Sequence, residues 1–321
     1  MELTLTILYR GPLASCNYGC WYCPFSKRPP NAADVDVDAA KLARLVNWVE
    51  SRGGDALSFF FTPWGEALIH KAYQEAILRL AALPQIRKVA AQTNLSGSLD
   101  WLEYAPAGKV ALWTTYHPGQ VSRASFVAQC GRLTALGIRY SVGVVGLLEN
   151  AAEIMALRAA LPPEVYLWIN AYKDRGNYYS AAQVKEFSEV DSLFPLNTLG
   201  HSSAGRSCRC GNQVVSVDGD GNMRRCHFVP EILGNIYKAG FPACLKESPC
   251  PAPMCGCHIG YVHLDYLNLC EVFGAGLLER IPDGWPDALK FRSAGGNASD
   301  HQSRPSTQLL VGKSPYPAGH A

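Results

Sequence analysis

Residues 55–84 read DALSFFFTPWGEALIHKAYQEAILRLAALP, and they contain one complete strand–helix unit. The apolar and aromatic run at residues 55–62 is typical of a buried β-strand. Residues 66–84 instead repeat apolar side chains at helical spacing and end at Pro84. A buried strand followed by an amphipathic helix is the unit from which helix-covered parallel sheets are built, so this stretch predicts further units on either side of it.

Five more strands with the same character surround that unit. Strands are predicted at residues 3–10, 86–94, 109–117, 138–146 and 164–170. Helical segments are predicted between them at residues 37–53, 98–104, 122–137 and 151–162. Six such units are too few for a closed eight-fold barrel. The sequence therefore predicts an α/β fold, a partial (β/α)6 TIM-like barrel over residues 1–200.

Composition excludes several classes of protein. The formal net charge of +2 over 321 residues is too small to indicate a nucleic-acid or membrane-surface partner. The first residues lack the basic start and apolar run of a secretory signal, and no stretch reaches the length of a membrane span. We therefore expect a cytoplasmic protein. In that reducing compartment twelve cysteines indicate metal binding more than disulfides.

Three of those cysteines, Cys16, Cys20 and Cys23, lie in the loop after the first predicted strand. A structural zinc site closes with four ligands, and a ferredoxin-type cluster takes four cysteines. Three thiolates on a 4Fe–4S cluster leave one iron without a protein ligand, which is a place for chemistry. A zinc loop that borrows its fourth ligand from elsewhere in the chain remains the alternative.

The loop has the pattern Cys-x3-Cys-x-aromatic-Cys, with Tyr22 at the aromatic position. This pattern after the first strand of a βα series resembles the radical S-adenosylmethionine superfamily. The resemblance implies that Cys16, Cys20 and Cys23 hold a 4Fe–4S cluster whose open iron binds S-adenosylmethionine. It also implies reductive cleavage to a 5′-deoxyadenosyl radical that abstracts a substrate hydrogen, with the protein holding both molecules away from solvent.

Motifs at the ends of later strands resemble further cofactor-contacting positions of that family. Residues 64–67, Trp-Gly-Glu-Ala, stand where the family has a Gly-Gly-Glu-Pro type motif. Gly65 would permit close backbone approach, and Glu66 would accept a hydrogen bond from the cofactor's ammonium. A plain helix N-terminal carboxylate remains the alternative for Glu66. The resemblance implies further contacts at Thr93, Asn94, Thr115 and Val144.

Beyond about residue 200 the chain changes character, because eight of its twelve cysteines lie between 208 and 270. Residues 209–226 predict a β-hairpin, and a segment this rich in cysteine is expected to need metal for its core. The hairpin and residues 233–241 resemble the SPASM extension, or its shorter Twitch relative. This implies a small cysteine-rich β-hairpin/α domain over residues 201–285 with one or two auxiliary 4Fe–4S clusters.

Taken in chain order, the resemblance divides these cysteines into two sets. The first cluster is assigned Cys208, Cys210, Cys226 and Cys257, and the second Cys244, Cys250, Cys255 and Cys270. The spacing of the second set departs from the SPASM pattern. A pair of zinc sites is the alternative, and His258 and His263 could substitute as ligands in either case.

A few single residues outside these motifs are also candidates for a role. His227 follows the hairpin cysteine where related enzymes can carry a base, so it is a candidate general base. Arg224 and Arg225 beside it are alternatively surface charge on the hairpin. His117, at a strand end, either lines the site or orders its loop, and Cys130 is expected to be a buried free thiol. Residues 286–321 are rich in Gly, Ser and Pro, and we expect a disordered tail.

The resemblance implies a radical S-adenosylmethionine oxidoreductase that most often modifies a peptide or protein side chain. An electron donor of the flavodoxin or ferredoxin type is implied as a partner. Within the same enzyme class, a small-molecule or carbohydrate substrate is the alternative. A non-catalytic iron–sulfur or zinc protein is the alternative from another class. The sequence does not separate consumption of S-adenosylmethionine from its regeneration.

Overall fold

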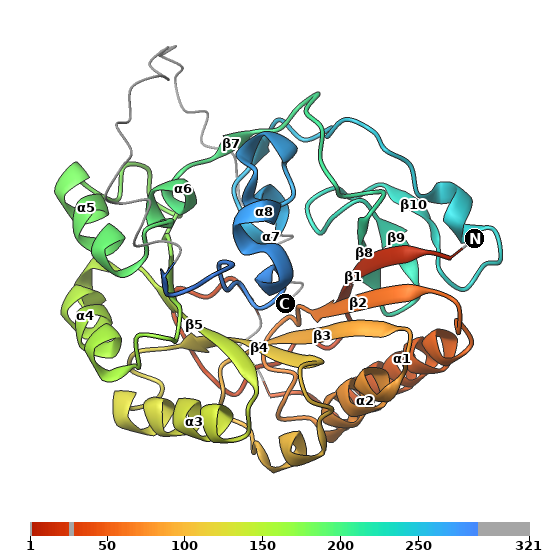
Figure 1. Cartoon of the computed structure of the whole chain (residues 1–321), viewed down its shortest axis with the longest axis horizontal. Coiled ribbons are helices and arrows are strands. Elements are labelled where there is room, and N and C mark those ends of the chain that lie inside the picture. The colour runs from red at the N-terminus through yellow and green to blue at the C-terminus, as the bar shows by residue number, and fades with distance from the viewer. Residues whose placement is uncertain (1, 26–28, 288–321) are drawn as a thin grey trace.

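One open sheet organises the chain in the computed structural model, which describes residues 2–25 and 29–287 (Figure 1). Six of its strands run parallel and follow one another in chain order across the sheet, and helical segments connect them. This arrangement confirms the predicted α/β partial barrel. These strands are β1 (Thr4–Arg10), β2 (Ala56–Phe61), β3 (Ile86–Thr93), β4 (Val110–Tyr116), β5 (Arg139–Val145) and β6 (Leu167–Asn170).

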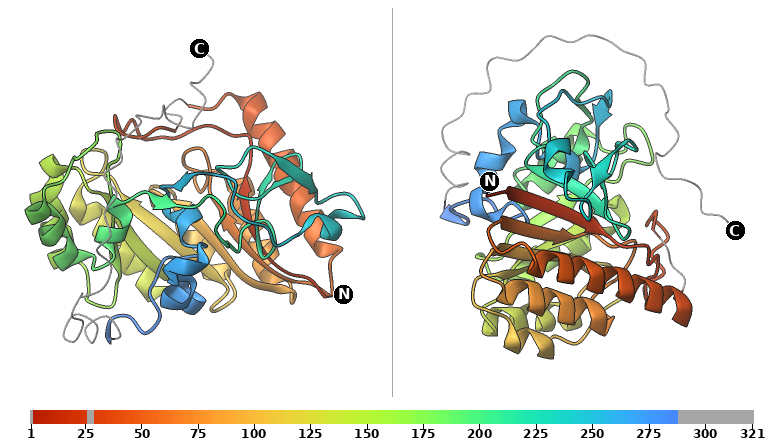
Figure 2. Two further views of the ribbon diagram at one scale, coloured as in Figure 1. Left: turned by 90° about the horizontal axis from the view of Figure 1, so that it is seen from above. Right: turned by 90° about the vertical axis from the view of Figure 1, so that its right-hand side faces the viewer.

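The connecting helices lie on the outer, convex face of the sheet. They are α1 (Ala32–Glu50), α2 (Lys71–Ala82), η1 (Asp100–Tyr104), α3 (Arg123–Ala135), η2 (Leu148–Asn150), α4 (Ala151–Ala160), α5 (Ala181–Val190) and α6 (Phe194–Thr198). Capping side chains begin three of the helices, at Asn31, Ser122 and Ser180. Figure 2 shows α1 and α2 side by side beneath the sheet.

Helix α2 begins at Lys71 rather than at the predicted residue 66. The backbone N–H of Glu66 donates to the carbonyl oxygen of Ser15, in the loop after β1, and the N–H of Leu68 donates to the Glu66 side chain. The N–H of His70 donates to the carbonyl oxygen of Ala67 rather than to that of Glu66, so residues 66–70 form a turn before the helix. Helical periodicity does not register these contacts.

Alternating side chains of the strands pack into two separate hydrophobic cores, one on each face of the sheet. On β1, Ile7 points toward the helices while Leu8 belongs to the inner core, and on β4 Leu112 and Trp113 divide in the same way. The inner core is completed by the segment after residue 257, whose helices α7 (His258–Tyr261) and α8 (Leu269–Phe273) lie inside the curve of the sheet (Figure 1).

The predicted hairpin extends the same sheet. Strand β8 (Val214–Asp218) pairs parallel with β1, and β9 (Asn222–Arg224) and β10 (Ile232–Asn235) follow it antiparallel. Lys41 on α1 reaches the hairpin turn, where its Nζ lies 2.8 Å from Asp220 Oδ1. The domain boundary predicted near residue 200 stays a prediction. The cysteine-rich part nevertheless shares hydrogen bonds with the barrel through β8.

Short elements complete the cysteine-rich part. They are β7 (His201–Ser202), paired antiparallel with β11 (Met254–Cys255), and the turns η3 (Phe241–Cys244), η4 (Asp265–Leu267) and η5 (Gly274–Gly276). No helix among the described residues has the length and apolar character needed to cross a membrane. The predicted tail lies almost wholly outside the described residues.

The last described segment contacts the N-terminal ends of two parallel strands. Glu279 is fully buried, and its carboxylate accepts hydrogen bonds from Lys88 at 2.6 and 2.9 Å and from Arg139 at 2.9 Å. Lys88 lies near the start of β3 and Arg139 begins β5. One carboxylate thus connects two strands to the segment that fills the inner face.

Candidate functional site

The loop after β1 carries three thiols at the carboxyl end of the parallel strands. Cys20 is buried, and Cys16 and Cys23 are half-buried. The N–H of Cys23 donates to the carbonyl of Cys20 across a tight turn. Two further contacts anchor the loop: Asn17 Nδ2 donates to Ser96 Oγ at 2.9 Å, and the N–H of Gly19 donates to Gln120 Oε1 at 2.8 Å. The loops after β3 and β4 therefore hold these thiols in place.

Gly65 lies against this loop more closely than any other residue could. Its φ is +149°, and a Cβ built on it would lie 1.8 Å from the carbonyl oxygen of Ser15. The N–H of the next residue, Glu66, donates to that same oxygen at 2.9 Å. Absence of a side chain at position 65 thus lets the segment after β2 pack on the backbone directly preceding Cys16.

We expect Gly65→Ala to destabilise the fold by roughly 1–3 kcal/mol, because the methyl group forces the two segments apart. Urea unfolding measures the change. Gly54→Ala is the matched control, since nothing lies within 4 Å of a Cβ at that position and its φ is not positive. That variant should stay within about 0.5 kcal/mol of the parent. Equal midpoints for the two variants would contradict the close packing at Gly65.

The carboxylate of Glu66 is buried at the end of β2 and accepts three hydrogen bonds. Oε1 accepts from the N–H of Leu68 at 2.9 Å and from Thr93 Oγ1 at 3.0 Å, and Oε2 accepts from the N–H of Asn94. Burial raises the pKa of Glu66 to about 7, although these bonds oppose the rise. A carboxylate has about four acceptor positions, so one remains for another donor.

Asn94 connects Glu66 to the thiol loop. Its side-chain Nδ2 donates to Asn17 Oδ1 at 3.0 Å and lies 3.9 Å from Cys16 Sγ. Its backbone N–H donates to Glu66. The structure therefore brings Gly65, Glu66, Thr93 and Asn94 together around Cys16, as the sequence predicted for residues at successive strand ends.

Thr115 and Val144 are placed differently from each other. Thr115 is half-buried on β4 and pairs with Gly143, whose added Cβ would meet the Trp168 ring of the inner core. Val144 instead packs in the outer core under the helices and is fully buried. Its side chain thus does not face the thiol loop, and any contact with a ligand there would come from its backbone.

Tyr22 and His117 form a contact with Cys20 inside the loop. The Tyr22 hydroxyl lies 3.0 Å from His117 Nδ1, and Cys20 Sγ lies 3.4 Å from the same nitrogen. The two rings stack with an interplanar angle of 16°. Burial lowers the pKa of His117 to about 4, so the ring is neutral and fit to accept from the tyrosine. His117 therefore both lines the site and orders the loop.

The cysteines beyond residue 200 gather mostly in one group, called here the distal thiol group. Burial raises the pKa of Cys255 to about 12, and repulsion from the neighbouring thiols of residues 208, 226, 250 and 257 adds to the rise. Burial likewise raises the pKa of Cys226 to about 11, with Cys250 and Cys208 contributing. Cys210 shares a hydrogen bond with Cys208, and Cys270 is influenced by the same thiol. The group comprises Cys208, Cys210, Cys226, Cys250, Cys255, Cys257 and Cys270.

Cys244 lies elsewhere, packed against the outer core beside Gly234 on β10. A Cβ on Gly234 would lie 2.7 Å from Cys244 Sγ. The observed grouping crosses the division made by chain order, since Cys250 and Cys255 lie with Cys208 and Cys226. Within the described part of the chain, no three His, Cys, Asp or Glu side chains are grouped tightly enough to hold a single metal ion. The residues of a cubic cluster each bind a different iron and need not meet at one point.

Comparisons with known proteins were made for the whole chain. No family model matches it, and no match was found among curated proteins. Among solved structures it is similar to anSMEcpe with bound AdoMet and Cp18Cys peptide, at 17% identity and a TM-score of 0.49, covering 76% of this chain and 81% of that one.

Two other solved structures are similar over comparable lengths. BtrN in complex with AdoMet and 2-DOIA has 16% identity and a TM-score of 0.35, with 77% of this chain and 89% of that one covered. The Escherichia coli coproporphyrinogen III oxidase HemN, described as a radical SAM enzyme, has 10% identity and a TM-score of 0.45, covering 67% and 63%. At these values the likeness carries no argument about chemistry.

Arg225 is a residue of the site that sequence reasoning missed. It is 4% exposed rather than a surface charge, and its guanidinium donates to Ser248 and, at 3.4 Å, to the carbonyl oxygen of Cys208. Arg224, which is half-buried, pairs with Asp218 at 2.8 Å. Arg224 ends β9 and Arg225 follows it, and only the contacts of Arg225 with Ser248 and Cys208 reveal that its side chain is covered.

The remaining candidate residues are three histidines, His227, His258 and His263, and the isolated thiol of Cys130. Both ring nitrogens of His227 contact hydroxyl groups, and burial lowers its pKa well below the ordinary value. Its predicted role as a base is not tested by these contacts. His258 and His263 are buried next to the distal thiol group, with His263 Nδ1 4.0 Å from Cys270 Sγ. Cys130 is buried in the outer core, as expected, where burial raises its pKa to about 12.

Proposed function

We propose that this chain is a radical S-adenosylmethionine enzyme. The observation that carries the proposal is the convergence of three thiols with Gly65 and with the buried Glu66 carboxylate at one end of a parallel sheet. An all-sulfur donor set of Cys16, Cys20 and Cys23 suits an iron–sulfur cluster, since thiolates are the ligands such clusters prefer.

The 4Fe–4S cluster with S-adenosylmethionine would supply the electron and the 5′-deoxyadenosyl radical that abstracts a substrate hydrogen. The chain's own residues bind and orient. Glu66 uses its remaining acceptor position for the cofactor ammonium, while Gly65 allows the backbone to approach it. Asn94 and Thr93 hold that carboxylate in place, and His117 holds the Tyr22 hydroxyl, which would leave Tyr22 available to contact the cofactor.

The distal thiol group supports one auxiliary 4Fe–4S cluster. Two clusters held only by cysteine need eight thiolates, whereas Cys244 packs in the outer core and seven thiols remain together. Arg225 places a buried positive charge beside them, which would offset part of the negative charge of a cluster. We therefore propose a Twitch-like domain within residues 201–285.

A peptide or protein side chain is the proposed substrate, and a flavodoxin or ferredoxin is the proposed electron donor. Aromatic side chains beside the thiol loop support the former. Trp21 is 59% exposed and contacts the ring of Tyr172 edge-on, and Tyr172 in turn contacts Tyr178. Such rings bind side chains and backbone of an extended segment at low entropic cost.

Anaerobic reconstitution tests the proposal. Loaded protein reduced with dithionite should form 5′-deoxyadenosine from S-adenosylmethionine, and iron analysis should approach about 8 per chain for two 4Fe–4S clusters. Absence of 5′-deoxyadenosine from fully loaded protein would overturn the enzyme proposal. A zinc-dominated analysis would overturn the cluster assignment, and about 12 iron per chain would overturn the single auxiliary cluster.

S-adenosylmethionine affinity should depend on pH through Glu66. Because the pKa of this carboxyl is raised to about 7, it is protonated below that pH and cannot pair with an ammonium. We expect the dissociation constant to rise as pH falls through about 7, approaching tenfold per pH unit. Isothermal calorimetry on loaded protein measures it. Glu66→Gln should bind weakly at every pH, whereas the exposed Glu103→Gln should keep the parental profile. A flat profile in the parent would contradict the role of Glu66.

A further inference from the structure

Thr62 is the residue at which three parts of the chain meet. It directly follows β2, is 0% exposed, and lies three residues before Gly65. Its backbone N–H and hydroxyl both donate to the carbonyl oxygen of Tyr9, at 2.9 and 3.3 Å. Its own carbonyl oxygen accepts a 2.6 Å hydrogen bond from Arg10 Nε. The backbone that leads into the Gly65–Glu66 segment is therefore held through this one residue.

His227 joins Thr62 to the cysteine-rich part. Its Nε2 lies 2.8 Å from Thr62 Oγ1, and its Nδ1 lies 2.6 Å from Ser216 Oγ on β8. Since the Thr62 hydroxyl donates to Tyr9, it must accept from Nε2–H, which leaves Nδ1 to accept from Ser216. The ring is thus hydrogen-bonded at both nitrogens, to Thr62 on one side and to Ser216 on the other. Cys226 of the distal thiol group immediately precedes this residue.

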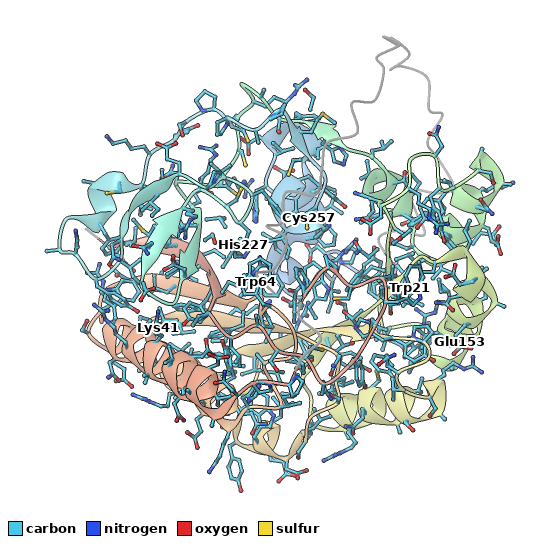
Figure 3. The ribbon with its side chains drawn as sticks, turned by 180° about the vertical axis from the view of Figure 1, so that it is seen from behind. Trp21, Lys41, Trp64, Glu153, His227 and Cys257 are labelled. Atoms are coloured by element: carbon cyan, nitrogen blue, oxygen red, sulfur yellow. The ribbon has the colours of Figure 1, made fainter. Side chains whose placement is uncertain are left out.

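A stack of three side chains, Arg10, Trp64 and Phe25, extends from Thr62 to the first thiol loop. The Arg10 guanidinium, which donates to Thr62, lies 4.2 Å above the ring of Trp64. Phe25, two residues after Cys23, contacts that ring edge-on with centroids 5.4 Å apart. Figure 3 marks the positions of His227, Trp64 and Cys257 in the fold. Trp64 replaces the first glycine of the family's motif, so the stack is a feature of this chain.

We propose that Thr62 and His227 are positioning residues that couple the distal thiol group to the S-adenosylmethionine segment at Gly65 and Glu66. This inference rests on the proposed function. Metal held by the distal thiols fixes Cys226, hence the His227 ring, hence Thr62 and the backbone that leads to Gly65. By thermodynamic linkage, loading of the distal thiols and binding of S-adenosylmethionine then strengthen each other, with coupling typically about 5-fold or more.

The test is a set of dissociation constants for S-adenosylmethionine, measured by calorimetry on reconstituted protein. In the parent, Cys250→Ala/Cys255→Ala, confirmed by iron analysis to lack the distal cluster, should weaken binding about fivefold. Thr62→Val keeps the shape of the side chain but removes the hydroxyl. It should weaken binding similarly, and adding the cysteine changes to it should cause no further loss. Thr62→Ser should restore the parental behaviour.

Thr114→Val is the matched control, because Thr114 is also 0% exposed and donates its hydroxyl hydrogen bond to the carbonyl of Ser141 on a neighbouring strand. A purely structural effect would lower the unfolding midpoint of both valine variants and leave the cofactor affinity of both unchanged, which would overturn the coupling. Parental affinity in Cys250→Ala/Cys255→Ala would overturn it as well. Failure of the parent itself to bind S-adenosylmethionine would overturn the proposed function and the coupling together.

Discussion

Replacing Cys20 with alanine is expected to abolish formation of 5′-deoxyadenosine and to remove about 4 iron per chain. Cys20 is 5% exposed and begins the turn, since its carbonyl oxygen accepts from the N–H of Cys23. His117 Nδ1 lies 3.4 Å from its sulfur. Two thiols remain in the loop after the change. The distal thiol group is held by separate elements, so it cannot supply a thiolate in place of Cys20.

Cys130→Ala is the matched control, since this thiol is equally buried but packs in the outer core on α3. It should keep the parental iron content and product formation. Electron paramagnetic resonance of the reduced proteins separates the clusters, because addition of S-adenosylmethionine should alter the spectrum of the parent and of Cys130→Ala but not that of Cys20→Ala. Product formation by Cys20→Ala would contradict the assignment of this loop.

Most of the barrel could be predicted because its units are local. Alternating or continuous apolar runs placed β1 to β5 within one residue of their observed ends, and β6 was predicted three residues too early at its start. Helix α2 was the clear boundary error at a functional position. Residues 66–70 have a helical pattern, but the N–H of Glu66 donates to Ser15 and that of His70 donates to Ala67 in a turn, so the helix begins only at Lys71.

The site could be predicted where one strand end carries one motif, as with Gly65, Glu66 and Asn94. Prediction failed where the answer depended on which faces come together. Val144 follows the strand alternation onto the helix-covered face, and Arg225 is buried where it contacts Ser248 and the carbonyl oxygen of Cys208. Chain order could not divide the distal cysteines, because the fold brings Cys250 back beside Cys226 and leaves Cys244 apart.

The hydrogen bonds of Glu279 could not be predicted from the sequence either, since Lys88 lies 191 positions away along the chain. We expect Glu279→Gln to destabilise the protein by about 3 kcal/mol, because removing one partner leaves the other charge poorly solvated. Lys88 carries most of this effect, since its side chain is 16% exposed, whereas that of Arg139 is 51% exposed and screened by solvent. The melting temperature should fall by roughly 6–12 °C.

Glu75→Gln provides the matched control. Glu75 pairs with Lys71 on the surface, where the two side chains are 61% and 85% exposed, respectively. That change should cost less than about 0.5 kcal/mol in urea unfolding. A double variant sharpens the argument: Lys88→Met should be destabilising alone, but Lys88→Met/Glu279→Leu should recover much of the loss, since both buried charges are then gone and the remaining charge, on Arg139, is half exposed to solvent. If the effects of Lys88→Met and Glu279→Leu, each measured alone, simply added in the double variant, that result would contradict the pairing of the carboxylate with Lys88.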